Sequence, residues 1–228
     1  MASNRRNWRA RRVLKWGALV LVALAVLAGI VLGPMLLDYH RFDQAVGAAS
    51  LERLAAGGQW PRRSDACMPC HGAGGNTASP GYARLAGQPK DYVVAQLNAF
   101  ASGERPSVVM SPLALELSGE EISALGDFFQ SRPVTGHAPF AVDPERVKKG
   151  ELLVKSGNCI ACHGAVLQGQ GVNPRLAGQG NDYLAKQLLA FKSGARRDRQ
   201  GVMAAITATM SEDDVESVAH YLATFKAR

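Results

Sequence analysis

The sequence Cys-x-x-Cys-His-Gly occurs twice in this chain, at residues 67–72 and at residues 159–164. This pattern is the attachment signature of c-type haem. The two thiols of one tight turn add to the two vinyl groups of haem, and the histidine that follows gives a nitrogen to the iron. The sequence therefore predicts two covalently bound haem c groups. The predicted attachment residues are Cys67, Cys70, His71, Cys159, Cys162 and His163.

All four cysteines of the chain belong to these two motifs, which leaves none for a disulfide. Zinc is an alternative ligand for paired cysteines. The two pairs are far apart in the sequence, however, and each carries its own histidine, so haem is favoured over zinc. A haem bound through thioethers matures outside the cytoplasm, so the lack of disulfides does not indicate a cytosolic protein.

The net charge of +7 is concentrated at the N-terminus. Its first 16 residues contain no acid and include the bases Arg5, Arg6, Arg9, Arg11, Arg12 and Lys15. A basic cluster in front of an apolar run is typical of a membrane protein. The high net charge is therefore no argument for a nucleic-acid partner, and we predict none.

Residues 17–37 contain no charged side chain. A helix of that length is about 30 Å long, the thickness of the apolar core of a bilayer. The preceding basic cluster would hold the N-terminus in the cytoplasm. The sequence thus predicts a single-pass inner-membrane protein whose haem domains lie in the periplasm. The alternative is a cleaved signal peptide, whose apolar region is usually shorter.

The remainder of the chain repeats itself after about 90 residues. For example, the sequence Leu-Ala-Gly-Gln at 85–88 recurs at 176–179, and Ser118 recurs as Ser211. A duplication of this length predicts two domains. The predicted boundaries are 1–37 for the basic tail and transmembrane anchor, 38–57 for a tether, 58–132 for the first domain, 133–142 for a linker and 143–228 for the second domain.

Each copy has the signals of helices and none of strands, which predicts an all-α fold. Asp143 followed by Pro144 marks the start of a helix that runs to about Lys155. Ser118 and Ser211 each precede an acidic residue three positions later, the pattern of a capping box at the last helix of each copy. Four aromatic residues at equivalent positions are candidates for packing against haem or for ordinary core, namely Tyr92, Phe100, Tyr183 and Phe191.

The second axial ligand of each iron decides the chemistry. Met110 and Met203 lie at matching positions of the repeat, at nearly equal distances after His71 and His163. A thioether ligand raises the reduction potential relative to a second histidine. The predicted iron ligands are therefore His71, Met110, His163 and Met203. With both axial positions filled by side chains, each haem is suited to electron transfer and no catalytic residue is predicted.

A ligating histidine usually donates its other ring proton to a nearby acceptor. The backbone carbonyl of Pro174 is the candidate for His163, and Ala83 takes its place in the first copy. The second copy is also the more basic of the two. We therefore expect Arg196, Arg197 and Arg199 to meet a redox partner.

Residues 58–228 resemble the diheme class I cytochromes c, and within them most closely the cytochrome c4 family. The resemblance rests on the two haem motifs, the repeated Leu-Ala-Gly-Gln segment and a methionine before a serine-capped last helix. It implies two tandem class I cytochrome c domains related by a pseudo-twofold axis. It also implies a quinol-oxidising complex or a dehydrogenase as electron donor, and a terminal oxidase or another acceptor. Ala83 and the pair Trp60 and Pro61 depart from the pattern of the second copy.

These observations together predict a periplasmic diheme cytochrome c that is anchored in the membrane by residues 17–37. Its predicted function is to transfer single electrons between respiratory complexes, and we do not expect it to be an enzyme. One alternative is a cytochrome subunit of a membrane dehydrogenase or oxidase. Another is a diheme peroxidase-type enzyme, which would need one haem with an exchangeable axial position.

Overall fold

The structure is a computed structural model that describes residues 16–19, 21–22, 26–34, 36–37, 63–136, 140–198 and 200–226. The contacts of the chain divide it into two units, Met1–Ala49 and Ser50–Arg228. The predicted tether 38–57 and the predicted break at Trp60 and Pro61 lie outside the described residues.

The described parts of the apolar run, residues 16–19, 21–22, 26–34 and 36–37, are helical. A bilayer core requires about 20 continuous apolar residues in one helix. Within the described residues, no helix combines the length and the apolar character needed to cross a membrane. This finding overturns the prediction of a single-pass inner-membrane protein with periplasmic haem domains and an anchor at 17–37.

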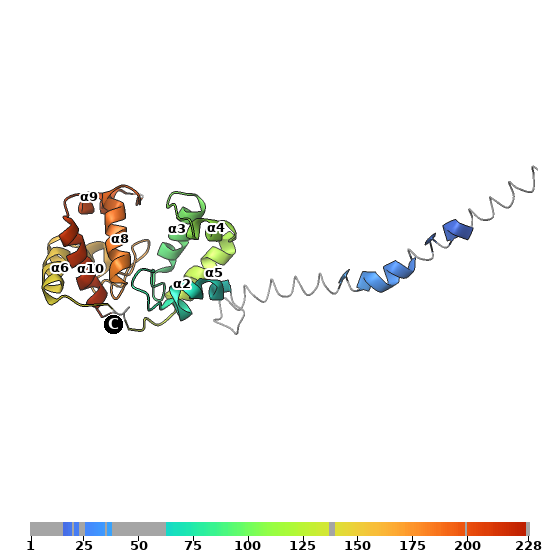
Figure 1. The fold of residues 1–228 in the computed structure, drawn as a ribbon, viewed down its shortest axis with the longest axis horizontal. Helices are drawn as coiled ribbons and strands as arrows, with labels where there is room; N and C mark the ends of the chain where they lie inside the picture. The colour runs from blue at the N-terminus through green and yellow to red at the C-terminus, as the bar shows by residue number, and fades with distance from the viewer. Residues whose placement is uncertain are drawn as a thin grey trace, which may run out of the picture. The chain divides into compact units, whose positions relative to one another are not determined.

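The N-terminal half of the second unit, residues 63–136, is built from short helical turns followed by three helices. Figure 1 shows its helices α3, α4 and α5 gathered in one group, in green. Lys90–Ala101 and Gly119–Gln130 are its longest helices. Its elements in chain order are η1 (Arg63–Cys67), α2 (Met68–His71), η2 (Ala73–Gly75), α3 (Lys90–Ala101), α4 (Met110–Leu115) and α5 (Gly119–Gln130).

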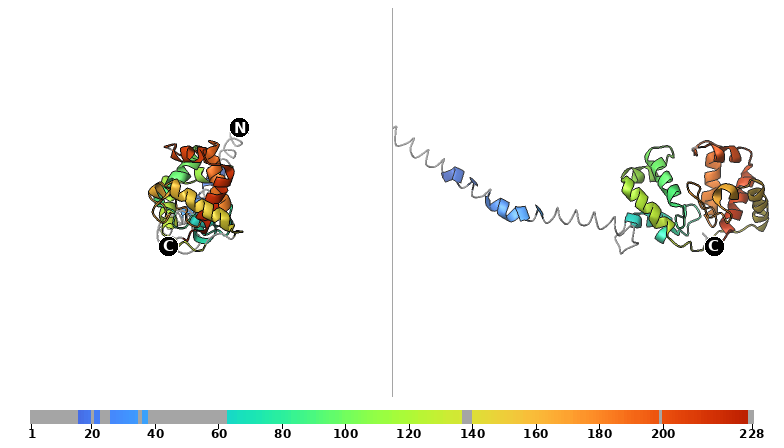
Figure 2. Two further views of the ribbon diagram at one scale, coloured as in Figure 1. Left: turned by 90° about the vertical axis from the view of Figure 1, so that its left-hand side faces the viewer. Right: turned by 180° about the vertical axis from the view of Figure 1, so that it is seen from behind.

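The C-terminal half, residues 140–226, repeats this arrangement and adds a long helix before its haem motif. Figure 2 shows its helices from two further sides, coloured from yellow to red. Its elements are α6 (Pro144–Ser156), α7 (Ile160–His163), α8 (Asn181–Lys192), α9 (Val202–Ala208) and α10 (Glu212–Thr224). The described residues contain no strand beyond an isolated bridge between Gln170 and Asn173. The prediction of a mostly helical protein is confirmed.

The helix ends are formed by the side chains that the sequence indicates. The Oδ1 atom of Asp143 accepts hydrogen bonds from the backbone N–H groups of Glu145 and Arg146, which caps α6. Ser118 and Ser211 both form complete capping boxes with the acidic residue three positions later. Local sequence alone therefore fixes where α5, α6 and α10 begin.

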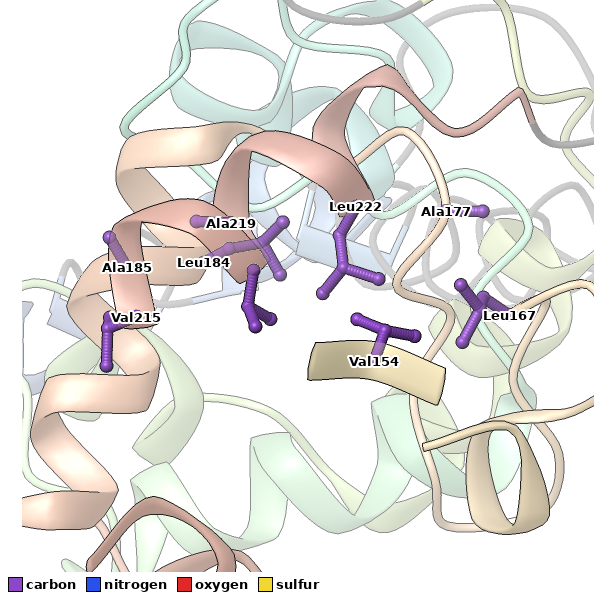
Figure 3. Close-up of a cluster of buried hydrophobic side chains, with 9 residues drawn as sticks. Val154, Leu167, Ala177, Leu184, Ala185, Val215, Ala219 and Leu222 are labelled. Carbon is purple, nitrogen blue, oxygen red and sulfur yellow. The ribbon is translucent and has the colours of Figure 1, made fainter. Parts of the chain in front are cut away.

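Each half has a hydrophobic core of its own. In the N-terminal half, α3 and α5 enclose Val93, Leu125, Phe128 and Phe129. The core of the C-terminal half, shown in Figure 3, consists of Val154, Leu167, Ala177, Leu184, Ala185, Val215, Val218, Ala219 and Leu222. Met210 packs against this second core. Two cores support two domains, while the boundaries at 58–132 and 143–228 stay a prediction.

Helices α6 and α10 meet at a point where only glycine fits. A Cβ atom on Gly150 would lie 2.0 Å from the backbone oxygen of Ser217 and 2.8 Å from the Cβ of Tyr221. The missing side chain therefore allows two backbones to touch. This contact orients α6, and the end of α6 leads directly into the second haem motif.

We predict that Gly150→Ala lowers the free energy of unfolding by about 1–3 kcal/mol, because the added methyl group forces the two helices apart. Denaturant unfolding of the haem-loaded protein measures this loss. The matched control is Gly119→Ala at the start of α5, where nothing lies within 4 Å of the added atom. The control should be neutral or stabilising by about 0.5 kcal/mol. Equal effects of the two substitutions would contradict the proposed close contact.

Candidate functional site

Each Cys-x-x-Cys-His motif folds into one helical turn. Cys67 precedes α2, and His71 is the last residue of that turn. The glycine that follows each histidine has a positive φ, 76° at Gly72 and 85° at Gly164. A side chain at Gly72 would also lie 2.6 Å from the backbone of Thr77. Glycine is therefore required for the chain to reverse direction directly after the histidine.

The ring of each motif histidine is oriented by a backbone carbonyl. The Nδ1 atom of His71 lies 2.8 Å from the oxygen of Ala83, and the Nδ1 atom of His163 lies 2.8 Å from the oxygen of Pro174. A carbonyl only accepts, so Nδ1 carries the proton and Nε2 keeps a free lone pair. The predicted acceptor Pro174 is confirmed. Ala83 serves equally well because the acceptor is a backbone atom.

Burial sets the protonation of the groups in the two turns. It lowers the pKa of His71 and of His163, and the hydrogen bond to the carbonyl only partly opposes this shift. It raises the pKa of the Cys67 thiol to about 11, with further contributions from Asp65 and Cys70, and it also raises the pKa of Cys159. Reactive or metal-bound cysteines require the opposite shift, towards the thiolate. A neutral histidine keeps the Nε2 lone pair that iron ligation requires.

Met110 and Met203 are held at equivalent places, in the first turns of α4 and α9. The Oγ atom of Ser107 accepts a hydrogen bond from the N–H of Met110 at 3.0 Å. In the C-terminal half, Asp198 Oδ1 accepts from the N–H of Met203 at 3.2 Å. Both methionines are half-buried. Different side chains thus fix the same backbone position, while ligation of iron by these methionines stays a prediction.

The two halves exchange a reciprocal set of hydrogen bonds through two glutamines. Gln179 Oε1 accepts from the N–H of Arg84 at 2.9 Å, and its Nε2 donates to the carbonyl of the same Arg84 at 2.6 Å. In the same way, Gln88 Oε1 accepts from the N–H of Arg175 at 2.9 Å, and Gln88 Nε2 donates to the carbonyl of Arg175 at 3.1 Å. All four residues are 2% exposed. We call this set of Arg84, Gln88, Arg175 and Gln179 the glutamine clamp.

A second reciprocal contact is formed by the arginine after each long helix. Arg196 donates to Tyr92 Oη at 3.2 Å and to Gln96 Oε1 at 2.9 Å, both in the other half. It also donates to Gln187 in its own half and stacks over Phe191 at 4.6 Å. Arg196 is 8% exposed, so the expectation that it forms part of a surface for a redox partner is wrong.

Arg105 repeats this pattern in the opposite direction. Across the contact, it donates to Tyr183 Oη at 3.2 Å and to Gln187 Oε1 at 2.8 Å. In its own half, it donates to Gln96 and stacks over the ring of Phe100 at 4.6 Å. The aromatic residues predicted to pack on haem or in the core therefore contact these arginines. The sequence analysis missed Arg105 and gave Arg196 a different role, although their equivalent positions in the repeat carry the signal.

Residues 147–226 match the sequence profile of the family described as Cytochrome c. The "Thiosulfate dehydrogenase electron acceptor" of Thiomonas intermedia (strain K12) is 35% identical over 74% of this chain and 84% of its own length. "Cytochrome c4" of Thiocapsa roseopersicina is 36% identical over 68% of this chain and 85% of its own length. The reduced cytochrome c4 of Pseudomonas stutzeri superimposes with a TM-score of 0.67 at 27% identity, over 72% of this chain and 95% of that chain.

The chain belongs to the cytochrome c4 family. Membership means a diheme electron-transfer cytochrome with two covalently bound haem c groups, as the motifs predict. It also favours haem over zinc as the cofactor, because the family binds haem c covalently.

The residues of this cytochrome fit two haem groups. All four cysteines are free, and each histidine offers an unshared Nε2. Arg84, Arg105, Arg175 and Arg196 also lie at the contact between the halves, with no carboxylate within ion-pair distance among the described residues. Burial, and then the charge of Arg84, lowers the pKa of Arg175 to about 10. Haem carries two propionate groups, so its charge complements this cationic interior.

The tyrosines of the cytochrome are coupled to the same charges. Burial alone would raise the pKa of Tyr92, but the positive charges of Arg196 and Arg105 outweigh burial and lower it. Burial, and then the neighbouring Tyr92, raise the pKa of Tyr183.

We predict that Tyr92→Phe lowers the free energy of unfolding by about 2 kcal/mol, because it removes a hydrogen bond from a buried guanidinium. Denaturant unfolding of the haem-loaded cytochrome measures the loss. Tyr82→Phe is the matched control, since Tyr82 is 49% exposed and should change stability by less than about 0.5 kcal/mol. A neutral Tyr92→Phe would mean that the contact with Arg196 contributes nothing.

Proposed function

We propose that this cytochrome c4 carries single electrons, with one haem attached to the Cys-x-x-Cys-His turn of each half and ligated by one histidine and one methionine. The repeated bond from a histidine Nδ1 to a backbone carbonyl, at 2.8 Å in both halves, is the observation that carries the proposal. The proposed attachment and ligand residues are Cys67, Cys70, His71 and Met110 for the first haem, and Cys159, Cys162, His163 and Met203 for the second.

Each residue has a defined task in this scheme. The cysteines fix haem covalently, and haem supplies the one-electron chemistry of iron when bound. The hydrogen-bonded histidines keep one tautomer and one ring orientation, which limits rearrangement on electron transfer. Met110 and Met203 would each supply the second protein ligand of one iron. With both ligands supplied by side chains, the iron would have no place for a substrate, as an electron carrier requires and a peroxidase-type enzyme does not.

The electron donor that we propose is a dehydrogenase, and specifically one that oxidises thiosulfate. The support is that relatives of 35% and 36% identity bear the name "Thiosulfate dehydrogenase electron acceptor". The alternative of a fixed cytochrome subunit of a dehydrogenase rests on the same names. A terminal oxidase as the acceptor stays a prediction from the resemblance.

We predict that both haems of the wild-type protein are low-spin and do not bind carbon monoxide, whereas Met110→Ala and Met203→Ala each open one haem to the gas. Visible spectra of the reduced protein with and without carbon monoxide measure this. Met210→Ala is the control, because Met210 packs against the core and should leave both spectra unchanged. A wild-type haem that binds the gas would favour the peroxidase-type alternative.

We predict that catalytic amounts of a purified thiosulfate dehydrogenase, together with thiosulfate, reduce both haems of this cytochrome. The measurement is the rate of haem reduction in a stopped-flow spectrometer. Thiosulfate without the dehydrogenase is the control and should reduce neither haem. If the dehydrogenase fails to reduce a protein that a chemical reductant does reduce, this donor is wrong while the electron-carrier proposal stands. Co-elution of the two proteins on sizing would favour the fixed-subunit alternative.

A further inference from the structure

One peptide group joins the first haem motif to the other half of the molecule. The carbonyl of Ala83 accepts the Nδ1–H of His71 at 2.8 Å. The N–H of the same peptide group, which belongs to Arg84, donates to Oε1 of Gln179 at 2.9 Å. His71 and Gln179 are thus connected through a single rigid amide, although they belong to different halves.

The second haem motif has the same connection in reverse. The carbonyl of Pro174 accepts the Nδ1–H of His163 at 2.8 Å, and the N–H of Arg175 donates to Oε1 of Gln88 at 2.9 Å. Each histidine therefore ends a chain of two hydrogen bonds that begins at a glutamine of the opposite half.

The amide of each glutamine is held in one orientation. Each glutamine binds one arginine twice: Oε1 accepts from the backbone N–H, and Nε2 donates to the backbone carbonyl of the same residue. The second bond is 2.6 Å long from Gln179 to Arg84 and 3.1 Å long from Gln88 to Arg175. A flipped amide would place its NH2 group against the N–H of the arginine and its oxygen against the carbonyl oxygen of the arginine. Both glutamines are 2% exposed, so no solvent screens these bonds.

Hydrogen bonds in series polarise one another. An acceptor on the N–H of a peptide group increases the negative charge on its carbonyl oxygen. The carbonyl then draws more strongly on the Nδ1–H of the histidine, which makes the free Nε2 a better electron donor. A stronger donor stabilises ferric iron and lowers the reduction potential.

We propose that Gln179 and Gln88 are positioning residues that lower the reduction potential of the haem in the opposite half. Gln179 acts on the haem of His71, and Gln88 acts on the haem of His163. The inference rests on the proposed attachment and histidine ligation. It makes the glutamine clamp an electronic connection between the two haem sites as well as a structural one.

The test measures the midpoint potential of each haem by NMR-monitored redox titration, with the haem-methyl resonances assigned to each half. Gln179→Leu should raise the potential of the haem of His71 selectively. At the wild-type midpoint potential, the ratio of reduced to oxidised haem in that half should increase about threefold, which corresponds to about 28 mV for one electron. Gln88→Leu should produce the same selective change at the haem of His163.

Gln187→Leu is the matched control. Gln187 also forms a hydrogen bond across the contact, to Arg105. It does not bind a peptide group whose carbonyl accepts a hydrogen bond from His71 or His163. A purely structural loosening of the contact should affect both haems alike in all three variants. Equal shifts of both potentials in Gln179→Leu, or a larger shift in its own half, would overturn the proposal.

Gln179→Asn keeps the experiment decisive if the leucine variant does not fold. Its side chain is one methylene shorter, which withdraws the amide oxygen from the Arg84 N–H, so the potential of the haem of His71 should rise by more than that of the other haem. Equal changes would again overturn the inference. Failure of the proposed function has a different result, because the wild-type protein would then lack two titratable covalent haems.

Discussion

The hydrogen bond from a histidine Nδ1 to a backbone carbonyl is the contact on which the rest of this structure depends. It fixes the tautomer that leaves Nε2 free, and it occurs at 2.8 Å in both halves. The carbonyls that accept it belong to Ala83 and Pro174, each directly followed by a buried arginine. Ligand orientation and the contact between the halves are therefore built from the same two peptide groups.

The contact between the halves is unusual in its charge. Four arginines lie there without a carboxylate partner among the described residues, and three of them are at most 8% exposed. Instead, these arginines donate hydrogen bonds to backbone carbonyls, glutamine amides and tyrosine hydroxyls. Neutral acceptors compensate buried cations only in part. The propionate groups of haem would complement this surplus of positive charge.

Much of the fold follows from local signals. The capping residues Asp143, Ser118 and Ser211 begin helices where the sequence indicates, because a cap is satisfied within one turn. The prediction of an inner-membrane anchor is wrong, because no helix among the described residues is long and apolar enough to span a bilayer. The expected surface role of Arg196 is also wrong, because its position in the repeat does not reveal that Tyr92 and Gln96 of the other half enclose it.

The sequence by itself determined the two haem motifs, the helical class, the duplication and the carbonyl that orients His163. Each of these depends on residues that are close in the chain or on the comparison of one copy with the other. Only the tertiary structure decided what the repeated Arg-Leu-Ala-Gly-Gln segment does. Its arginine and glutamine meet partners about 90 residues away, in the other copy. A repeat predicts that two segments fold alike, but contacts between the copies depend on how their surfaces pack, which no local pattern encodes.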